Sequence, residues 1–332
     1  MTAPETPGDP AAEYRAARAD AVLADRPDLG RLEITGKDAA DLLHRLTTND
    51  VRGLGPWEGT AAAFVTNKGR LVDLVTLHRL DARILCITGP GRSADVAAYI
   101  DRYTFGEDVR VRDLGATHGT LGLFGVRAAE RAAALFGPEA AGRPLHHAVA
   151  ITLRGAEAIL ARTFPLGGGG YHLTAEAGTL PALRRAILEG APGLRVAGPQ
   201  CLEALRLEAG LPLAGRELTG EYNPWEARLN DAISLNKGCY VGQEVIARLN
   251  TYRKVSRCLV RLRVRGGVPA PGARIEAGGL PIGTLTSAAS IPGEERVVAL
   301  GYVRDEDAVE GGEVEVIEDG RRFAAAVLGP AR

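Results

Sequence analysis

The sequence predicts an α+β protein with three parts: two domains in which antiparallel sheets are backed by helices, and a small all-β domain at the C-terminal end. Two observations lead to this prediction. Up to about residue 190, pairs of strand-like runs alternate with single helical runs, which favours antiparallel sheets over a doubly wound parallel sheet. Beyond residue 255 only short strand-like runs remain, separated by glycine and proline, which is typical of a barrel or a sandwich.

The first α+β domain is predicted over residues 28–115, together with a mainly helical segment at 201–250. Its expected elements are strands at 31–35, 61–66, 70–78, 83–88 and 109–113 and helices at 38–46 and 90–103. Asn67-Lys68-Gly69 favours positive φ angles and predicts a hairpin turn between two of these strands. Residues 1–27 are expected to form a disordered leader and a helix at 13–25, without a secretory signal.

The second α+β domain is predicted over residues 116–200. Its expected elements are strands at 119–124, 148–153, 158–164 and 171–174 and helices at 126–136 and 180–188. Four consecutive glycines at 167–170 could form a phosphate-binding loop, but such a loop needs a helix directly after it. Strand-like runs flank the glycines on both sides, so we predict a hairpin.

The third domain is predicted over residues 255–332 as a small β-barrel. Its expected strands are 258–264, 274–277, 282–287, 297–303, 313–317 and 322–328.

Composition limits the possible functions. Forty basic and 41 acidic residues give a net charge of −1, which argues against direct nucleic-acid binding and against charge-driven membrane binding. The four cysteines are widely spaced, and no two histidines share a helix face as ligands would, so no metal site is predicted. Free thiols and the absence of a long apolar run lead us to expect a monomer in the cytoplasm.

Cys239 is the first candidate catalytic residue. Gly238 and Gly242 permit a tight loop that would bring the thiol close to the N-terminus of a helix beginning at Gln243. The positive end of that helix and the charge of Lys237 would both favour the thiolate. We therefore expect an activated thiol, tuned by Lys237, at the mouth of a ligand cavity. The alternative is a cysteine that packs as a small buried hydrophobe.

Asp73 is the second candidate, because it interrupts an apolar strand at 71–77. A carboxylate there is costly unless it has a partner or faces a wet cavity, and the alternative is an edge strand on which Asp73 reaches solvent. On the helix that follows residue 200, we interpret Glu203, Arg206 and Glu208 as surface ion pairs.

Taken together, these motifs resemble the folate-binding YgfZ family, relatives of the glycine cleavage T protein (aminomethyltransferase), over about residues 30–330. The most specific motif is Lys237-Gly238-Cys239-Tyr240-Val241-Gly242-Gln243-Glu244, followed by Val245-Ile246-Ala247-Arg248. Weaker matches in the same order along the chain are Thr35-Gly36-Lys37-Asp38-Ala39, Thr48-Asn49-Asp50-Val51, Thr66-Asn67-Lys68-Gly69-Arg70, Leu205-Arg206-Leu207-Glu208-Ala209-Gly210 and Gly283-Thr284-Leu285-Thr286-Ser287.

The resemblance implies a ring of three domains around a central channel that binds tetrahydrofolate. It also implies a role in the assembly or repair of iron–sulfur clusters in client proteins, and through one client class an indirect effect on tRNA modification. Residues expected to bind the folate are Asp73, Tyr240, Gln243, Glu244 and Arg248. Two features depart from aminomethyltransferases: a single Asp at Val72-Asp73, and no carboxylate in Gly167-Gly168-Gly169-Gly170-Tyr171 to hold the pterin.

Three hypotheses follow. The first is a folate-dependent accessory factor for iron–sulfur proteins in which Cys239 is the working thiol. The second is a folate-dependent one-carbon transferase, either an aminomethyltransferase or a demethylase, in which Asp73 orients the folate. The third is a binding module without catalytic activity that docks a client through the all-β domain. The sequence leaves open whether any substrate is turned over.

Overall fold

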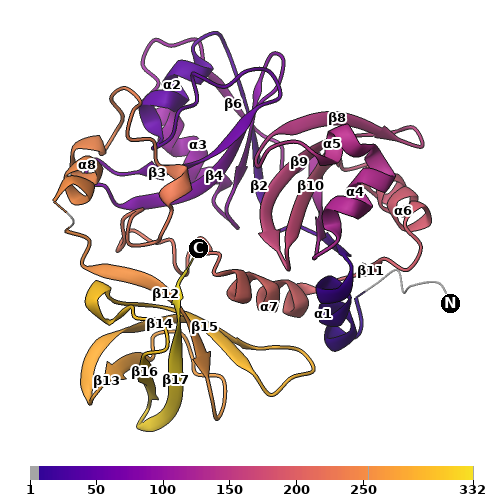
Figure 1. Ribbon diagram of the computed structural model, residues 1–332. Helices are drawn as coiled ribbons and strands as arrows, with labels where there is room; N and C mark the ends of the chain where they lie inside the picture. The colour runs from indigo at the N-terminus through magenta and orange to yellow at the C-terminus, as the bar shows by residue number, and fades with distance from the viewer. Residues whose placement is uncertain (1–6, 253, 332) are drawn as a thin grey trace.

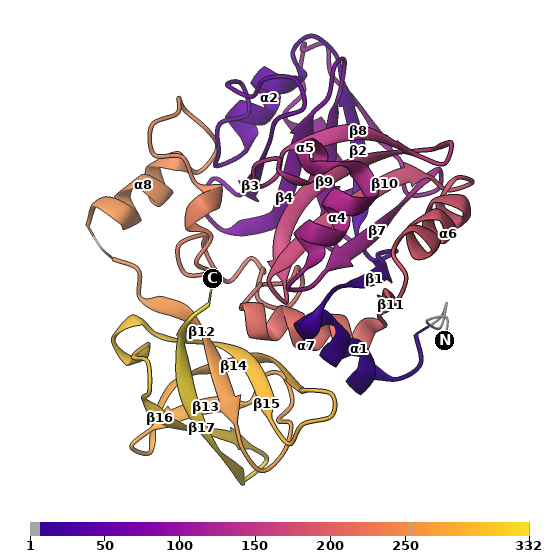
Figure 2. The same cartoon turned by 45° about the vertical axis from the view of Figure 1, so that its right-hand side comes forward.

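A computed structural model describes residues 7–252 and 254–331 and consists of three lobes (Figure 1). We call them the first sheet domain, the second sheet domain and the barrel. Figure 2 shows the barrel set apart from the two sheet domains, with helix α7 (Pro199–Ala209) lying between them. The predicted fold class, two antiparallel-sheet domains backed by helices plus a C-terminal β-barrel, is confirmed. Residues 1–6 of the expected leader lie outside the described residues.

The first sheet domain contains five strands in the order β3-β4-β5-β2-β6, all antiparallel. The strands are β2 (Gly30–Thr35), β3 (Gly59–Val65), β4 (Leu71–Arg79), β5 (Ile84–Thr88) and β6 (Arg110–Asp113). Helices α2 (Ala39–Leu46) and α3 (Ser93–Arg102) bury leucine, valine and isoleucine side chains against the sheet. The predicted hairpin is confirmed, since β3 and β4 pair across the turn at 67–69.

The second sheet domain contains six strands in the order β11-β1-β7-β10-β9-β8. They are β1 (Val22–Asp25), β7 (His118–Phe124), β8 (Ala148–Leu153), β9 (Ala156–Leu166), β10 (Gly169–Glu176) and β11 (Arg195–Val196). Helices α4 (Ala128–Phe136), α5 (Pro138–Ala141) and α6 (Leu180–Gly190) cover it. Gly167 and Gly168 form the β9–β10 hairpin turn at φ angles of 69° and 119°, so the hairpin prediction is confirmed.

The helix predicted at 13–25 is confirmed over residues 13–19 and wrong over 22–25, which form a strand. Helix α1 (Pro10–Ala19) begins earlier, where the carboxylate of Asp9 accepts hydrogen bonds from the amides of Ala11 and Ala12. The chain then forms β1, which pairs antiparallel with β7 and parallel with β11. Burial of Val22, Leu23 and Ala24 between two strands outweighs the helix propensity of these residues.

The barrel closes in the order β12-β15-β14-β13-β16-β17. Its strands are β12 (Arg257–Val264), β13 (Arg274–Ala277), β14 (Leu280–Ser290), β15 (Val297–Arg304), β16 (Glu313–Glu318) and β17 (Arg321–Pro330). Each of the six overlaps a predicted strand, and alternate apolar side chains fill the interior.

Residues 201–250 are not mainly helical, as the sequence had predicted. Helix α7 ends at Gly210, which adopts a left-handed φ of 68°, and α8 (Gln243–Thr251) begins only after about 30 residues of turns and one short 3-10 helix. This irregular segment is nevertheless well packed. The rings of Tyr222, in the segment, and Tyr302, in the barrel, are stacked with centroids 3.4 Å apart.

Candidate functional site

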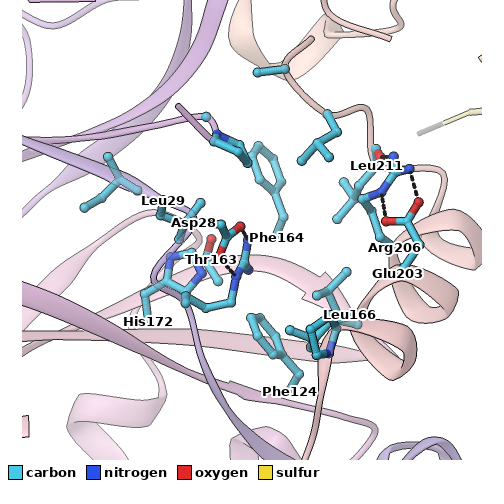
Figure 3. A pocket seen from close by; sticks show the side chains of 18 of the residues that line it. Asp28, Leu29, Phe124, Thr163, Phe164, Leu166, His172, Glu203, Arg206 and Leu211 are labelled. Atoms are coloured by element: carbon cyan, nitrogen blue, oxygen red, sulfur yellow. Dashed lines mark hydrogen bonds and ion pairs between the residues drawn. The ribbon is translucent and has the colours of Figure 1, made fainter. Parts of the chain in front are cut away.

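A cavity of about 560 Å³ lies where the two sheet domains and α7 meet. Its walls come from β4, the end of β5, residues 25–29, β9, β10 and residues 197–218, and no described barrel residue lines it. Most of the lining is apolar, and Figure 3 shows Phe124 and Phe164 between two polar walls. A mostly apolar cavity of this size with a few polar groups is typical of a small-molecule site.

Asp73 projects from β4 into this cavity and is completely buried. Its Oδ2 accepts a hydrogen bond from the amide of Gly89 at 2.9 Å, whereas Oδ1 has no hydrogen-bond partner among the described residues. Burial raises the pKa of Asp73 to about 7, and the Gly89 amide and the charge of Arg92 only partly oppose this shift. The carboxyl group can therefore be neutral or ionised near neutral pH, and one of its oxygens is free to bind a ligand.

The alternative of a solvent-facing Asp73 on an edge strand is wrong. Strand β4 lies between β3 and β5, so it is an inner strand of the sheet. At Asp73 the neighbouring strand β5 has already ended, and the chain turns away at Gly89. This early end leaves a polar side chain facing the cavity within an otherwise apolar sheet.

Helix α7 forms a second polar wall. Pro199, Leu202, Glu203 and Arg206 recur at helical spacing and line the cavity. The guanidinium of Arg206 donates two hydrogen bonds to Glu203, at 2.8 and 2.9 Å, and one to Glu217 at 3.0 Å. Because Arg206 is buried and Glu217 completely so, this network is part of the interior.

The interpretation of Glu203, Arg206 and Glu208 as surface ion pairs is therefore wrong. Glu208 also points elsewhere, accepting hydrogen bonds from Tyr14 at 2.7 Å and from Arg296 at 2.8 Å. Glu208 thus ties α7 to α1 and the barrel, while Arg206 and Glu203 face the cavity.

Opposite α7, residues of the second sheet domain and of the segment before β2 form the other polar wall (Figure 3). Arg26 and Asp28 form a bidentate pair at 2.9 and 2.7 Å beside His172 and Thr163. Burial, and to a lesser degree the charge of Arg26, lowers the pKa of His172 well below its usual value. His172 therefore faces the cavity as a neutral imidazole.

The Lys237–Cys239 loop lies at a different place, over the C-terminal end of α2. The ammonium group of Lys237 is buried and donates to the carbonyl oxygens of His44, Thr47 and Asn49, the last two at 2.7 and 2.8 Å. Burial lowers the pKa of Lys237 to about 8. The three carbonyl oxygens take all the donors of this ammonium group, so Lys237 fastens the loop to α2.

Cys239 is exposed, whereas Cys86, Cys201 and Cys258 are buried. The alternative of a buried structural cysteine is therefore wrong for this residue. The expectation that Cys239 opens onto the ligand cavity is wrong as well, because residues 235–251 do not line it.

The expected folate-binding residues divide between the two sites, the cavity and the Lys237–Cys239 loop with α8. Asp73 lines the cavity, whereas Tyr240, Gln243, Glu244 and Arg248 belong to α8 and the loop before it. Tyr240 is buried beneath the Lys237 ammonium, 4.9 Å from the ring centroid to Nζ, and Glu244 and Arg248 are exposed. These four residues do not contribute to the cavity.

Comparison with known proteins assigns the whole architecture. Residues 8–237 match the GCVT N-terminal domain, and residues 257–331 match the glycine cleavage T-protein C-terminal barrel domain. The chain belongs to the glycine cleavage T-protein family. An aminomethyltransferase of Symbiobacterium thermophilum is 31% identical over 330 residues, which cover 95% of this chain and 87% of the relative. One from Moorella thermoacetica is 32% identical over 320 residues, with the same coverage.

A solved structure agrees with this assignment. The crystal structure of glycine cleavage system aminomethyltransferase T from Bartonella henselae matches 96% of this chain and 88% of its own, with a TM-score of 0.80 and 26% identity. Membership of the glycine cleavage T-protein family confirms the wider kinship that the sequence motifs implied. In the described residues, no helix combines the length and apolar character needed to cross a membrane.

Proposed function

We propose that this glycine cleavage T-protein family member binds a reduced folate, tetrahydrofolate, in the cavity between the two sheet domains. The observation that carries the proposal is the free Oδ1 of the buried Asp73 in a largely apolar cavity. A pterin ring is flat and apolar on its faces and carries hydrogen-bonding groups on its edge. A carboxylate suits such an edge, and apolar walls suit such faces.

The lining residues fit this ligand without the pterin-holding carboxylate that the sequence lacks at 167–170. Asp73 would hold a polar edge or a proton of the ligand, and Phe164 and Phe124 would contact its rings. The folate would supply one-carbon chemistry when bound. The chain itself supplies water exclusion, orientation and a carboxyl group that can hold or release a proton at Asp73 Oδ1.

We further propose that the protein belongs to the YgfZ branch and supports the assembly or repair of iron–sulfur enzymes, and thereby tRNA modification, in the cytoplasm as a monomer. The exposure of Cys239, outside the cavity, supports this role, because a thiol on the surface can reach a group on another protein.

Two measurements test the proposal. Calorimetric titration with tetrahydrofolate should be saturable for the wild type and at least about 10-fold weaker for Asp73→Ala, since a buried hydrogen-bonding partner is removed. A flat titration of the wild type at millimolar ligand would favour a binding module without folate. In cells lacking the protein, Cys239→Ala should fail to restore the activity of an iron–sulfur enzyme. Asn236→Ala, at an exposed position in the same loop, should restore it.

A one-carbon transferase is the second candidate. It is favoured by an Asp73 pKa of about 7, suited to proton transfer near neutral pH, and by relatives named aminomethyltransferases. Product analysis with tetrahydrofolate and a methyl or aminomethyl donor distinguishes the two. Turnover abolished by Asp73→Asn supports the transferase, whereas tight folate binding without turnover supports the accessory factor.

A further inference from the structure

A buried histidine paired with a half-exposed carboxylate lies directly beneath the Lys237–Cys239 loop. His44, on α2, is 5% exposed, and its Nδ1 lies 3.0 Å from Oδ1 of Asp50. Asp50 is fixed in turn by the amide of Gly53, which donates to the same carboxylate oxygen at 2.9 Å. The pair lies outside the folate cavity, since neither residue lines it.

The loop passes over the other ring nitrogen of His44. A Cβ atom placed on Gly238 would lie 3.8 Å from Nε2, which has no hydrogen-bond partner in the described part of the chain. Cys239 is the next residue, one Cα step of about 3.8 Å away. Lys237 holds the loop here through the carbonyl oxygen of His44 itself. The free nitrogen of a buried imidazole therefore faces the segment that carries the exposed thiol.

The hydrogen bond to Asp50 determines which nitrogen can accept a proton. The backbone amide of Arg52 also approaches Nδ1, at 3.4 Å, but the contact of Nδ1 with the Asp50 carboxylate is shorter and involves a charged acceptor. A carboxylate only accepts, so Nδ1 carries the hydrogen toward Asp50 and the lone pair resides on Nε2. Burial lowers the pKa of His44, and the charges of Lys237 and Arg52 lower it further against the opposing charge of Asp50. The imidazole is therefore neutral at pH 7, as a proton acceptor must be.

We propose that His44, oriented by Asp50, is the general base of Cys239: Nε2 takes the proton from Sγ–H, leaving a thiolate and an imidazolium that the Asp50 carboxylate stabilises. This step requires a rotation of the loop at Gly238, where the absence of a side chain leaves the backbone free to turn, so that Sγ reaches Nε2. The combination of nucleophile, base and orienting carboxylate is a recurring solution for activating cysteine. This inference rests on the proposed role of Cys239 and assigns its proton acceptor.

The structure also argues against the simpler idea that Lys237 activates the thiol as a direct partner. All three hydrogens of its ammonium group are bonded to carbonyl oxygens, so none is left for a thiolate at Cys239. In this arrangement Lys237 positions the loop, and the proton goes to the neighbouring imidazole.

Alkylation of the native protein by iodoacetamide between pH 5.5 and 9.5, followed by mass spectrometry, tests the proposal. The three buried cysteines serve as internal controls, and Cys239→Ser should abolish the signal. His44→Gln should slow alkylation at pH 7 by about 10-fold relative to the wild type, because the proton acceptor is lost.

Two further variants separate proton transfer from charge and from folding. Arg52→Gln removes a nearby charge but keeps the pair, so its rate should stay within about twofold. Asp50→Asn changes a half-exposed side chain and should slow alkylation several-fold at pH 7, which decides the matter if His44→Gln unfolds. Unchanged alkylation rates in both the His44 and Asp50 variants would overturn the proposal.

Neither folate nor a client protein takes part in this assay. If alkylation behaves as expected but Cys239→Ala still restores client activity, the proposed function fails and the assignment of the base stands.

Discussion

The ionisation of Asp73 predicts a pH-dependent stability that a single substitution should remove. The carboxyl is buried with no counter-charge in contact among residues 7–252 and 254–331, and its pKa is raised from 3.8 to about 7. Between these two values the folded chain holds a proton that the unfolded chain has lost. Raising the pH through this window therefore favours unfolding, and the stability present below pH 4 is lost as the pH rises past 7.

The slope is about 1.4 kcal/mol per pH unit inside the window and levels off above it. From pH 5 to pH 8, the wild type should therefore lose about 2–3 kcal/mol that an Asp73→Asn variant retains. Asparagine has nearly the same shape and does not titrate. Its constant effects on packing and on the Gly89 hydrogen bond cancel when the two pH values are compared.

Urea unfolding of both proteins at pH 5, 6, 7 and 8 measures this difference. Asp95→Asn serves as the matched control, because Asp95 is exposed and paired with Arg92 at 2.6 Å, close to the same sheet. Its stability difference from wild type should vary by less than about 0.5 kcal/mol over the range. An equally flat difference for Asp73→Asn would show that the carboxyl is hydrated or paired in solution, and the argument for a ligand at Oδ1 would fail.

Three further substitutions test the packing around the two places. Arg206→Met should destabilise by about 3–5 kcal/mol in urea unfolding, because it leaves Glu217 buried and unpaired, and the added change Glu217→Gln should recover part of the loss. Lys237→Met should lower the free energy of unfolding by about 2–4 kcal/mol, since three carbonyl oxygens lose a charged donor. An unchanged midpoint of urea unfolding would contradict this. Gly242→Ala should lower the free energy of unfolding more than Gly266→Ala. Both glycines have left-handed φ angles near 80°, but only at Gly242 would a Cβ meet a carbonyl oxygen, at 2.5 Å.

The sequence predicted best those elements whose partners are near in the chain. The β3–β4 hairpin, the β9–β10 hairpin and the barrel strands are set by alternation and turn chemistry within 10–20 residues. Strand β1 escaped prediction because its partners, β7 and β11, are about 100 and 170 residues away and nothing local marks its four residues as a strand. The segment between α7 and α8 was misassigned for the same reason, since distant packing holds it.

The candidate site shows the same limit. Asp73 could be predicted because a lone carboxylate in an apolar strand is unusual in any fold. Arg206 and Glu203 could not, because an arginine three residues after a glutamate has the same pattern on a surface helix and on a buried one. Their burial is set by Glu217, which lies 11 residues beyond Arg206 and receives a hydrogen bond from Ser287 of the barrel at 2.6 Å.

The motif around Cys239 had a strong signal, but its mechanics were visible only in three dimensions. One buried nitrogen, Lys237 Nζ, meets three carbonyl oxygens that converge from the end of α2. A compact ammonium with three donors suits this point, whereas the planar fork of an arginine does not. The sequence suggested Lys237 as an electrostatic activator of the thiol. In the structure Lys237 instead holds the loop to the end of α2, and the proton acceptor that we propose is His44, oriented by Asp50.

The β3–β4 hairpin connects the cavity with α8 and the Cys239 loop, so ligand binding at the first site can affect the second. Asp73 lies on β4 inside the cavity, and at the turn of the same hairpin a Cβ on Gly69 would lie 3.2 Å from Val245 of α8. A ligand that shifts β4 through Asp73 would therefore also press on α8 and the loop before it. If this coupling operates, saturating tetrahydrofolate should change the alkylation rate of Cys239 in the wild type but not in Asp73→Ala. An equal rate with and without folate in the wild type would mean that the cavity and the thiol act independently.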